Sequence, residues 1–351
     1  MNDQSLAVET LALRDLPRQE SRLTTYRRRA VTGPVFLFAG LFAFALAPLV
    51  YPVALAFDVL GRRRLATVRA LAMAHVYLFC EAAGMAASAW IWLTRGSDLE
   101  SYLERNFRLQ CWWAGTLYRV GVWLFSLRVE IEGDEHVRTG PVLVFSRHVS
   151  PIDNLLPAAL ISAAHGLRLR WVINRSLLRD PCLDIVGNRL PNCFVAAGTG
   201  DSEAEVRRVR VLAHGLGERD GVLIFPEGAL FSPARRQRVL ARVEAAGDAR
   251  LLARARGLQN LLPPRLGGSI ALLEAAPAAD VAFLAHTGLE GATEYHNILR
   301  GGLIGRRVRV RIWRVPAAEI PVAAEARTSW LLDQWEAVDR WVSGERSANE
   351  R

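Results

Sequence analysis

The sequence predicts an α/β fold in which a mixed sheet is flanked by helices and preceded by an N-terminal membrane-associated helical segment. From about Val129 onward, short apolar runs alternate with stretches of helical periodicity, the pattern of a sheet covered by helices. Before that point, Val31–Phe57 holds 27 residues without a charged side chain, enough to cross a bilayer once. The chain has 351 residues, of which 51% are hydrophobic, and this composition excludes a disordered protein.

The hydrophobic segment of residues 31–100 is predicted to anchor the chain in a membrane, after a polar tail of residues 1–30. Its uncharged run begins too late and extends too far for the core of a signal peptide. Pro48 and Pro52 predict a kink or a re-entrant turn within it. A second apolar stretch, Ala70–Thr94, ends in tryptophans that favour the membrane–water interface. The alternative is a helical hairpin in the core of a soluble protein.

The charged residues around these stretches leave the membrane topology open. Arginine clusters at Arg27–Arg29 and Arg62–Arg64 flank the first stretch on both sides, so the positive-inside rule does not orient it. Glu81 lies inside the second stretch, where a helix-packing or interfacial position is favoured over an intramembrane functional site. The four cysteines form no CxxC motif, which fits a reducing compartment. We expect the protein at the cytoplasmic membrane, with the following domain facing the cytoplasm.

The α/β domain is predicted over residues 101–320, and a C-terminal helix and tail over residues 321–351. Residues 101–127 interleave tryptophans with arginines, a pattern that fits an interfacial amphipathic helix or a helix that covers the domain. The predicted strands are Val129–Glu132, Val142–Ser146, Leu169–Ile173, Cys193–Ala196, Val222–Phe225, Val281–Thr287 and Val308–Trp313. The predicted helices are Asn154–His165, Ser202–Leu216, Arg235–Ala246, Gly268–Ala276 and Thr328–Val342.

The charge balance is basic, with 44 Lys and Arg against 35 Asp and Glu, and all of the basic residues are arginine. Lipid head groups and phosphates fit this balance as anionic partners. No nucleic-acid-binding module accompanies it, so we expect no nucleic-acid partner. Between Arg235 and Arg256 seven arginines face two acidic residues, a stretch that fits a solvated helix or a contact with an anionic carrier, coenzyme A phosphates or lipid heads. The alternating Arg307, Arg309 and Arg311 predict a strand with one charged face. An edge strand, on which arginines prevent edge-to-edge pairing, is the favoured interpretation.

The first stretch that carries chemistry is an HxxxxD motif at the end of a predicted strand. His148 follows the strand, and Asp153 stands five positions on. A histidine can remove a proton near neutral pH when a carboxylate fixes its tautomer and stabilises the imidazolium. Pro151 makes the required turn of the loop credible. The alternative is that Asp153 caps a helix and His148 is a loop histidine.

A second stretch, FPEG, ends another buried strand about 75 residues later. A charged Glu227 at a strand end needs a partner, such as a hydroxyl, an arginine or backbone amides. Gly228 would let a ligand approach the backbone. The alternative is a solvated carboxylate in a turn. Of the remaining histidines, only His286 is kept as a minor site candidate.

The order of these motifs resembles the glycerolipid acyltransferase family, which includes 1-acylglycerol-3-phosphate acyltransferases. The resemblance covers roughly residues 107–320 and rests on HxxxxD followed by FPEG, which is similar to the start of the family's EGTR block. Gly187–Gly198 falls where the family has its GxxFIxR block, and Leu262–Gly268 with Val281–Gly291 falls where it has its late proline-containing block. The resemblance implies His148 as general base, Asp153 as its orienting carboxylate, and an acceptor site lined by Glu227 and Gly228.

The chain departs from the family at two arginines that are associated with the phosphate of the acceptor. Alanines occupy 196–197 in the second block, and Leu230 stands where EGTR has its arginine. Neither residue type can replace a bidentate phosphate contact. The arginines that could substitute are Arg147, Arg189, Arg235, Arg236 and Arg265.

The resemblance therefore predicts a membrane-associated acyltransferase that esterifies a lysophospholipid. Acyl-CoA or acyl carrier protein would be the co-substrate, with no metal or other cofactor, and the sequence does not indicate an oligomeric state. The alternatives are an acceptor without a phosphate and a catalytically weak lipid-binding relative of the fold. A thioester hydrolase is disfavoured because the chain lacks a GxSxG nucleophile elbow.

Overall fold

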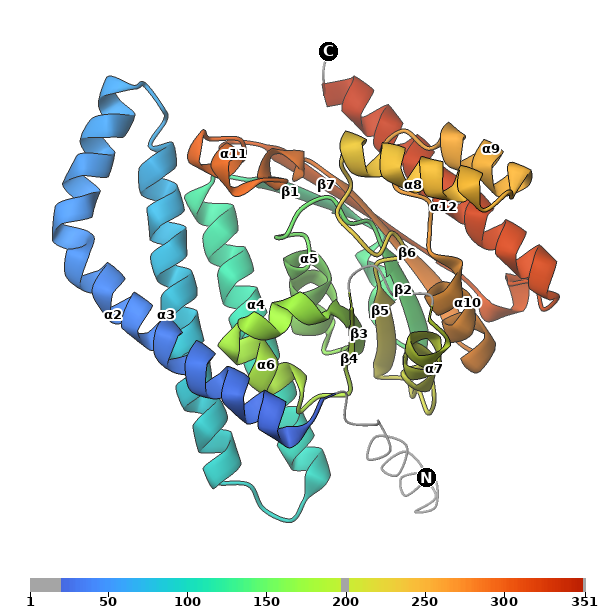
Figure 1. Cartoon of the computed structure of the whole chain (residues 1–351), viewed down its shortest axis with the longest axis horizontal. Helices are drawn as coiled ribbons and strands as arrows, with labels where there is room; N and C mark the ends of the chain where they lie inside the picture. Colours follow the sequence, from blue (N-terminus) through green and yellow to red (C-terminus); the bar gives the residue numbers. More distant parts are fainter. Residues whose placement is uncertain (1–19, 197–201, 350–351) are drawn as a thin grey trace.

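A computed structural model describes residues 20–196 and 202–349, and it contains a seven-stranded mixed sheet (Figure 1). The strand order is β1-β7-β6-β2-β5-β3-β4, and every neighbouring pair is parallel except β6 and β7. The predicted mixed α/β sheet is therefore confirmed. The strands are β1 (Arg128–Glu132), β2 (Val142–Ser146), β3 (Arg168–Asn174), β4 (Cys193–Val195), β5 (Asp220–Ile224), β6 (Asp280–Thr287) and β7 (Arg307–Val315).

Helices cover both faces of the sheet and bury a core on each. One core lies beneath α4 (Leu99–Leu124) and the π-helical turn η2 (Ala158–Ala163). The other lies beneath α7 (Glu203–Val211), α10 (Leu266–Ala275) and α12 (Ala324–Asn349). The remaining helices of the domain are α5 (Leu155–Pro157), α6 (Pro181–Gly187), α8 (Pro233–Ala245), α9 (Ala249–Gly257) and α11 (Tyr295–Leu299), with 3-10 turns η1 (Asp134–Val137), η3 (Arg175–Arg179), η4 (Glu290–Ala292) and η5 (Ala317–Glu319).

The central strands are apolar on both faces because helices cover both sides. Every residue of β2 and of β5 is buried. These two strands pair in parallel, so their carboxyl ends meet at one edge of the sheet. The residues that follow each strand therefore come together at that edge, where ligands bind in open α/β sheets.

The predicted edge strand of alternating arginines is wrong. β7 lies between β1 and β6, inside the sheet. Its arginines face carboxylates rather than solvent alone, since Arg307 pairs with Glu130 and Arg309 pairs with Glu345. The alternation therefore marks one charged face of an internal strand, not protection of an edge.

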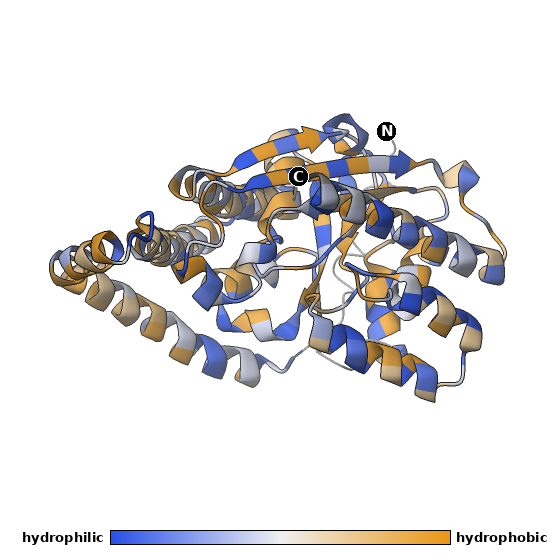
Figure 2. Ribbon diagram, turned by 90° about the horizontal axis from the view of Figure 1, so that it is seen from above, coloured by the Kyte–Doolittle hydropathy of each residue, from blue (hydrophilic) through white to orange (hydrophobic). Residues whose placement is uncertain are grey.

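The N-terminal segment forms a hairpin of two long helices, α2 (Arg22–Leu60) and α3 (Ala66–Leu93), both long and apolar enough to cross a membrane. Pro48 and Pro52 stand inside α2, which bends but continues as one helix, so a kink replaces the re-entrant turn. In Figure 2 the outer part of α2 is mostly orange and tan, and blue residues appear toward its inner end. The predicted boundary between the polar tail and the apolar segment falls within α2, and residues 1–19 lie outside the described part of the chain.

The hairpin is tied to the domain by polar side chains at its inner end. Arg28 and Arg29 both contact the fully buried carboxylate of Asp184 on α6. Glu81 of α3 accepts hydrogen bonds from the indole of Trp113 and the backbone N–H of Cys182. Glu81 therefore occupies the helix-packing position that the sequence favoured.

α4, expected either as an interfacial helix or as a helix that covers the domain, packs on α3 and η2. It therefore covers the domain, while Trp123 stays exposed.

Candidate active site

The site forms where β2 ends and the chain turns sharply. The imidazole Nδ1 of His148 lies 2.7 Å from Oδ1 of Asp153. The second carboxylate oxygen of Asp153 accepts the backbone N–H groups of Val149 (2.7 Å) and Ser150 (2.9 Å). Asp153 therefore folds the loop back on itself and orients the histidine with the same carboxylate. It is buried completely, so its charge acts at short range in a poorly solvated environment.

The electrostatics of the pair favour a charged imidazole beside a charged carboxylate. Burial lowers the pKa of His148, but the charge and hydrogen bond of Asp153, together with the charge of Glu227, outweigh burial and raise it above its ordinary value. Burial raises the pKa of Asp153, but the neighbouring His148 outweighs that effect and the pKa is lowered. The pair can hold the proton that a general base takes up.

The other ring nitrogen, Nε2, faces away from Asp153 and has no hydrogen-bond partner among the described residues. The ring packs on Phe225 at a centroid distance of 4.3 Å, which fixes its plane. The side chain keeps 17% of its surface exposed. His148 is thus held rigidly, with its reactive nitrogen open to a substrate.

Glu227, which the resemblance places in the lining of an acceptor site, lies beside the histidine. It is buried, and its two oxygens accept the backbone N–H groups of His148 (2.7 Å) and Leu262 (2.8 Å). Burial raises its pKa to about 7, partly opposed by those two hydrogen bonds. Of the partners that the sequence allowed, the backbone amides are the ones observed. Glu227 therefore holds the main chain of the catalytic loop.

Gly228 has a positive φ of 61°, and the side chain of Arg265 passes over it. A Cβ at this position would come within 2.6 Å of Nε of Arg265. The backbone N–H of Arg265 donates to Pro226 O at 2.8 Å. The guanidinium itself has no hydrogen-bond or ion-pair partner among the described residues. The positive φ therefore favours glycine here, whereas the flexible side chain of Arg265 would have to shift to admit a Cβ.

The other arginines proposed to hold a phosphate are mostly committed elsewhere. Arg147 is fully buried and pairs with Glu290, so it is not available to a substrate. Arg189 donates to Ser88 O on α3 and Arg236 to Leu258 O after α9, so both tie elements together. Arg235 donates to Leu230 O from the start of α8 and lies close enough to lower the pKa of His148.

His286, a minor site candidate from the sequence, lies next to Asp153 of the His148–Asp153 pair, which we call the dyad. Its Nε2 lies 3.6 Å from Oδ2 of Asp153, and it is fully buried. His286 lies on β6, which pairs with β2 and so brings the histidine close to Asp153. The apolar run of this buried strand is the sequence feature that could have placed His286 beside the site. The alanines that replace the family arginine begin at Ala196, and residue 197 lies outside the described part of the chain.

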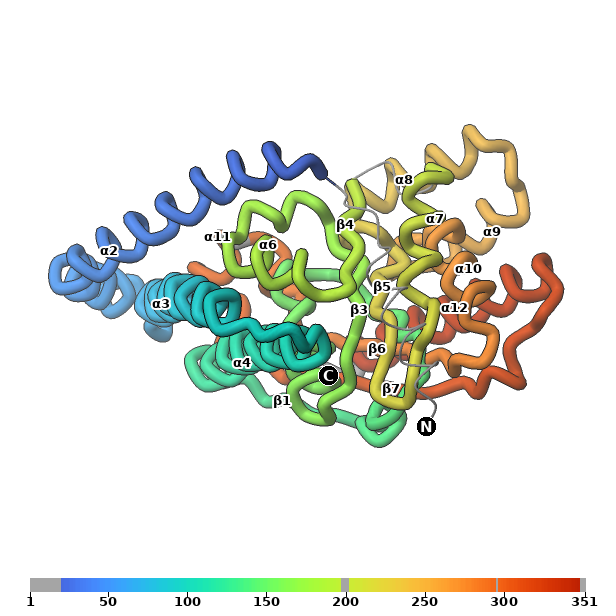
Figure 3. Tube along the Cα trace, turned by 90° about the horizontal axis from the view of Figure 1, so that it is seen from below, coloured from blue at the N-terminus to red at the C-terminus, as the bar shows by residue number. Residues whose placement is uncertain are grey.

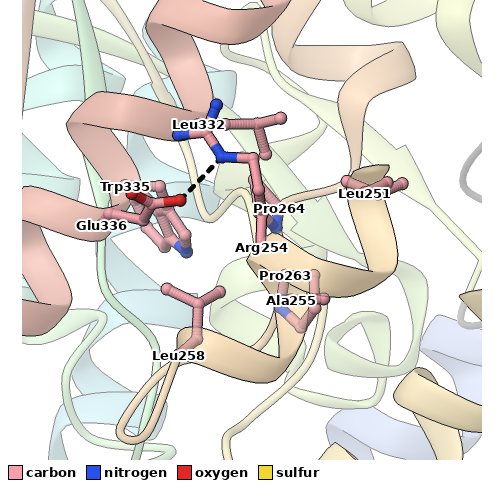
Figure 4. Close-up of a pocket in the computed structure, with 9 residues that line it drawn as sticks. All are labelled: Leu251, Arg254, Ala255, Leu258, Pro263, Pro264, Leu332, Trp335 and Glu336. Carbon is pink, nitrogen blue, oxygen red and sulfur yellow. Dashed lines mark hydrogen bonds and ion pairs between the residues drawn. The ribbon is translucent and has the colours of Figure 1, made fainter. Parts of the chain in front are cut away.

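Two pockets adjoin α9 away from the dyad. The smaller, of about 10 Å³, holds at most one water and lies between α9 and α12, where Arg254 contacts Glu336 (Figure 4). The larger is an open groove of about 380 Å³ between the same helices. Neither is lined by His148, Asp153 or Glu227, so neither belongs to the candidate active site. Within residues 20–196 and 202–349, no cluster of three His, Cys, Asp or Glu side chains could hold a metal ion.

Comparison with known proteins agrees with this geometry. Residues 128–275 match the family model described as Acyltransferase. The fold is similar to that of the crystal structure of the 1-acyl-sn-glycerophosphate (LPA) acyltransferase PlsC from Thermotoga maritima, with a TM-score of 0.51, 15% sequence identity, and coverage of 81% of this chain and 97% of that one. A search of curated proteins finds no match. His148, Asp153 and Glu227 all lie inside the residues matched by the family model.

Proposed function

We propose that this chain, whose residues 128–275 match the acyltransferase family model, moves a fatty acyl group from a thioester to the hydroxyl of a lysophospholipid at a membrane surface. The observation that carries the proposal is the His148–Asp153 contact of 2.7 Å at the carboxyl edge of the sheet. The PlsC structure is titled as an acyltransferase for 1-acyl-sn-glycerophosphate. That substrate, a lysophospholipid, is the model for the acceptor proposed here.

The reaction needs one base and one stabiliser of negative charge. Nε2 of His148 accepts the proton of the acceptor hydroxyl as the oxygen attacks the thioester carbonyl. The new C–O bond forms, the C–S bond breaks, and the proton passes from the imidazolium to the departing thiolate. The amides of Val149 and Ser150 already bind Asp153, so they do not serve the developing oxyanion. The N-terminus of α8 and Arg235 are the nearby positive groups that support it.

The head group of the acceptor is proposed to contact Arg265. Its guanidinium lies over Gly228, beside the loop in which Leu230 replaces the family arginine. Arg265 thus lies near the position that the family fills from the loop itself. This favours a phosphate-bearing acceptor over the alternative of an acceptor without a phosphate.

Membrane attachment through α2 and α3 completes the proposal, because a lysophospholipid acceptor resides in a bilayer. The apolar side chains of α2 are exposed along most of its length, including Phe38 at 71% and Leu41 at 70%. Such an apolar surface is far larger than a soluble monomer exposes. The structure does not orient the chain, and the cytoplasmic side remains our expectation.

A panel of lysolipids with different head groups tests this function, assayed with acyl-CoA and acyl carrier protein as donors. Thiol release and the mass of the lipid product are followed together. We expect lysolipid-dependent thiol release that is lost in His148→Ala. Thiol release without an acylated lipid would instead identify a thioester hydrolase. Lipid binding without thiol release would identify a lipid-binding relative of the fold.

A gain-of-function variant tests the acceptor. If Arg265 holds the phosphate, Leu230→Arg should change acceptor preference little, and Arg265→Ala should raise KM for phosphate-bearing acceptors alone. If the enzyme prefers another head group, Leu230→Arg should raise activity toward lysophosphatidate more than toward neutral acceptors. No change in preference from either substitution would contradict an acceptor site beside Gly228.

A further inference from the structure

The helical pair α8–α9 is a basic protrusion that begins at the catalytic loop. The backbone N–H of Phe231 donates to His148 O at 2.9 Å, and α8 starts two residues later, capped by Ser232. At 1.5 Å per residue, its 13 residues lead about 20 Å away from the dyad. α8 has no buried residue and packs on α9. One end of the protrusion is therefore at the reaction centre, and the rest projects toward solvent.

The seven arginines of this pair divide into two groups. Four have partners that hold the protrusion in place: Arg235 donates to Leu230 O, Arg236 to Leu258 O and Arg256 O, Arg254 to Asp333 and Glu336, and Arg256 to Glu244. The other three, Arg238, Arg242 and Arg250, are exposed, and no carboxylate of the described chain lies within ion-pair distance of them. Arg238 and Arg242 are one turn apart on α8, where like charges repel. Their charge is thus not used within the chain.

The position of this surface separates it from the membrane-binding hairpin. Figures 1 and 3 place α8 and α9 at the opposite end of the molecule from the turn between α2 and α3. A lipid acceptor is expected from the hairpin side, and a water-soluble acyl donor from the other. The exposed arginines do not line a deep pocket, and the open groove beside Arg250 also contains the carboxylates of Asp248 and Glu325. These carboxylates disfavour an anionic nucleotide in that groove, whereas exposed arginines on the outside of α8 suit the acidic face of a protein.

We propose that Arg238, Arg242 and Arg250 form a docking surface for an acidic carrier protein that presents the acyl chain as a thioester on a flexible arm. This inference rests on the proposed acyl transfer and adds the partner that delivers the donor. The carrier would dock on the outer part of α8–α9, and its arm would follow α8 toward His148. Charge complementarity would accelerate the encounter of the carrier with the enzyme. The exposed arginines should therefore raise kcat/KM for the carrier thioester, most clearly at low ionic strength.

The test compares two donors that carry the same acyl chain, one on an acidic carrier protein and one on coenzyme A, with the full-length protein and one lysophospholipid acceptor. The variant is Arg238→Glu/Arg242→Glu. The control is Arg138→Glu/Arg219→Glu, which makes the same charge change near the amino ends of β2 and β5, at the opposite edge of the sheet. We expect kcat/KM for the carrier thioester to fall roughly tenfold or more in the first variant alone. Turnover of acyl-CoA should change less than twofold, which also shows that the variant is folded.

Several results would overturn the docking surface. An equal loss with both donors would assign the arginines to coenzyme A phosphates, and loss of binding to phosphatidylglycerol vesicles would assign them to the membrane. An unchanged kcat/KM for the carrier thioester, or a wild-type protein that uses acyl-CoA but not the carrier thioester, would remove the docking role while leaving acyl transfer intact. A wild-type protein that consumes neither thioester would overturn the proposed function itself.

Discussion

The candidate active site at the carboxyl edge of the sheet and the N-terminal hairpin differ in how much of their surface the chain itself covers. At the catalytic edge, Asp153 and Glu227 are buried and bind backbone amides of the same chain. Along the hairpin, large apolar side chains remain exposed, among them Phe42 at 67% and Leu60 at 85%. The buried carboxylates of the first region are bonded within the chain, whereas the apolar side chains of the second are not covered by the described residues. Internal bonds hold the groups of the candidate active site in place, and the exposed hairpin is the surface that we propose to bind a bilayer.

The two regions are nevertheless joined. Asp184 on α6 receives Arg28 and Arg29 from the start of α2, and Glu81 on α3 binds the backbone at the start of α6. α6 precedes β4, so the hairpin is attached to the domain beside the strand at one edge of the sheet. The effects of changes in the two regions should be separable, because these contacts do not include the dyad.

The largest effect that separates the regions is expected from His148→Ala. Loss of the general base should lower kcat by roughly 10²–10⁴-fold while sedimentation with vesicles stays as in the wild type. His136→Ala, a histidine on η1 outside the site, is the matched control. A variant that kept near-normal turnover would show that a different residue takes the proton.

Asp153→Asn should have the next largest effect, lowering kcat roughly 10²-fold and changing the pH dependence of kcat/KM. The neutral imidazole is the active base, so kcat/KM falls as the pH drops through the pKa of His148. Asp153 raises that pKa, whereas burial lowers it. Removing the carboxylate charge should therefore move the acid limb of the pH–rate profile to lower pH. Near-normal turnover with an unmoved limb would reduce Asp153 to a residue that only shapes the loop.

The fold was predictable from the sequence to the extent that local patterns determine it. All seven strands were predicted, with boundaries shifted by at most two residues, because buried strands appear as short apolar runs. The helix expected over Asn154–His165 is observed from Leu155 to His165, with π-helical geometry over Ala158–Ala163. The placement of β7 inside the sheet was missed, since strand order depends on pairings that are distant in the sequence.

The site was predictable where spacing alone brings residues together. His148 and Asp153 are five positions apart, and a sharp turn suffices to join them. Arg147 and Arg265 were not distinguishable as phosphate ligands, because the direction of a side chain beside a strand end depends on β6 and on the loop before α10. Arg147 turns inward to Glu290, and Arg265 passes over Gly228. Composition carries no information on that choice.

The hairpin can be tested independently by Phe38→Asp/Phe42→Asp. Each phenylalanine contributes roughly 1.5–3 kcal/mol when it leaves water, so the partition coefficient for lysophospholipid-containing vesicles should fall by about a hundredfold or more. Turnover with a short-chain, water-soluble acceptor should remain. Val322→Asp, at an equally exposed apolar residue outside the hairpin, is the control. Equal vesicle binding by both variants would contradict membrane attachment through α2.

The smallest effect is expected from Arg265→Ala, and it sharpens the comparison because Arg265 is an arginine beside the dyad that has no partner among the described residues. Arg265 is half-buried beside Gly228, and we expect its guanidinium to bind the phosphate of the acceptor. A charge-assisted hydrogen bond contributes about 1.5–3 kcal/mol, so KM for phosphate-bearing acceptors should rise roughly ten- to a hundredfold with kcat nearly unchanged. Neutral-headed acceptors serve as the internal control. A fall in kcat for both acceptor classes would instead indicate that Arg265 supports the loop around Gly228, and the phosphate would have to be held by another cation.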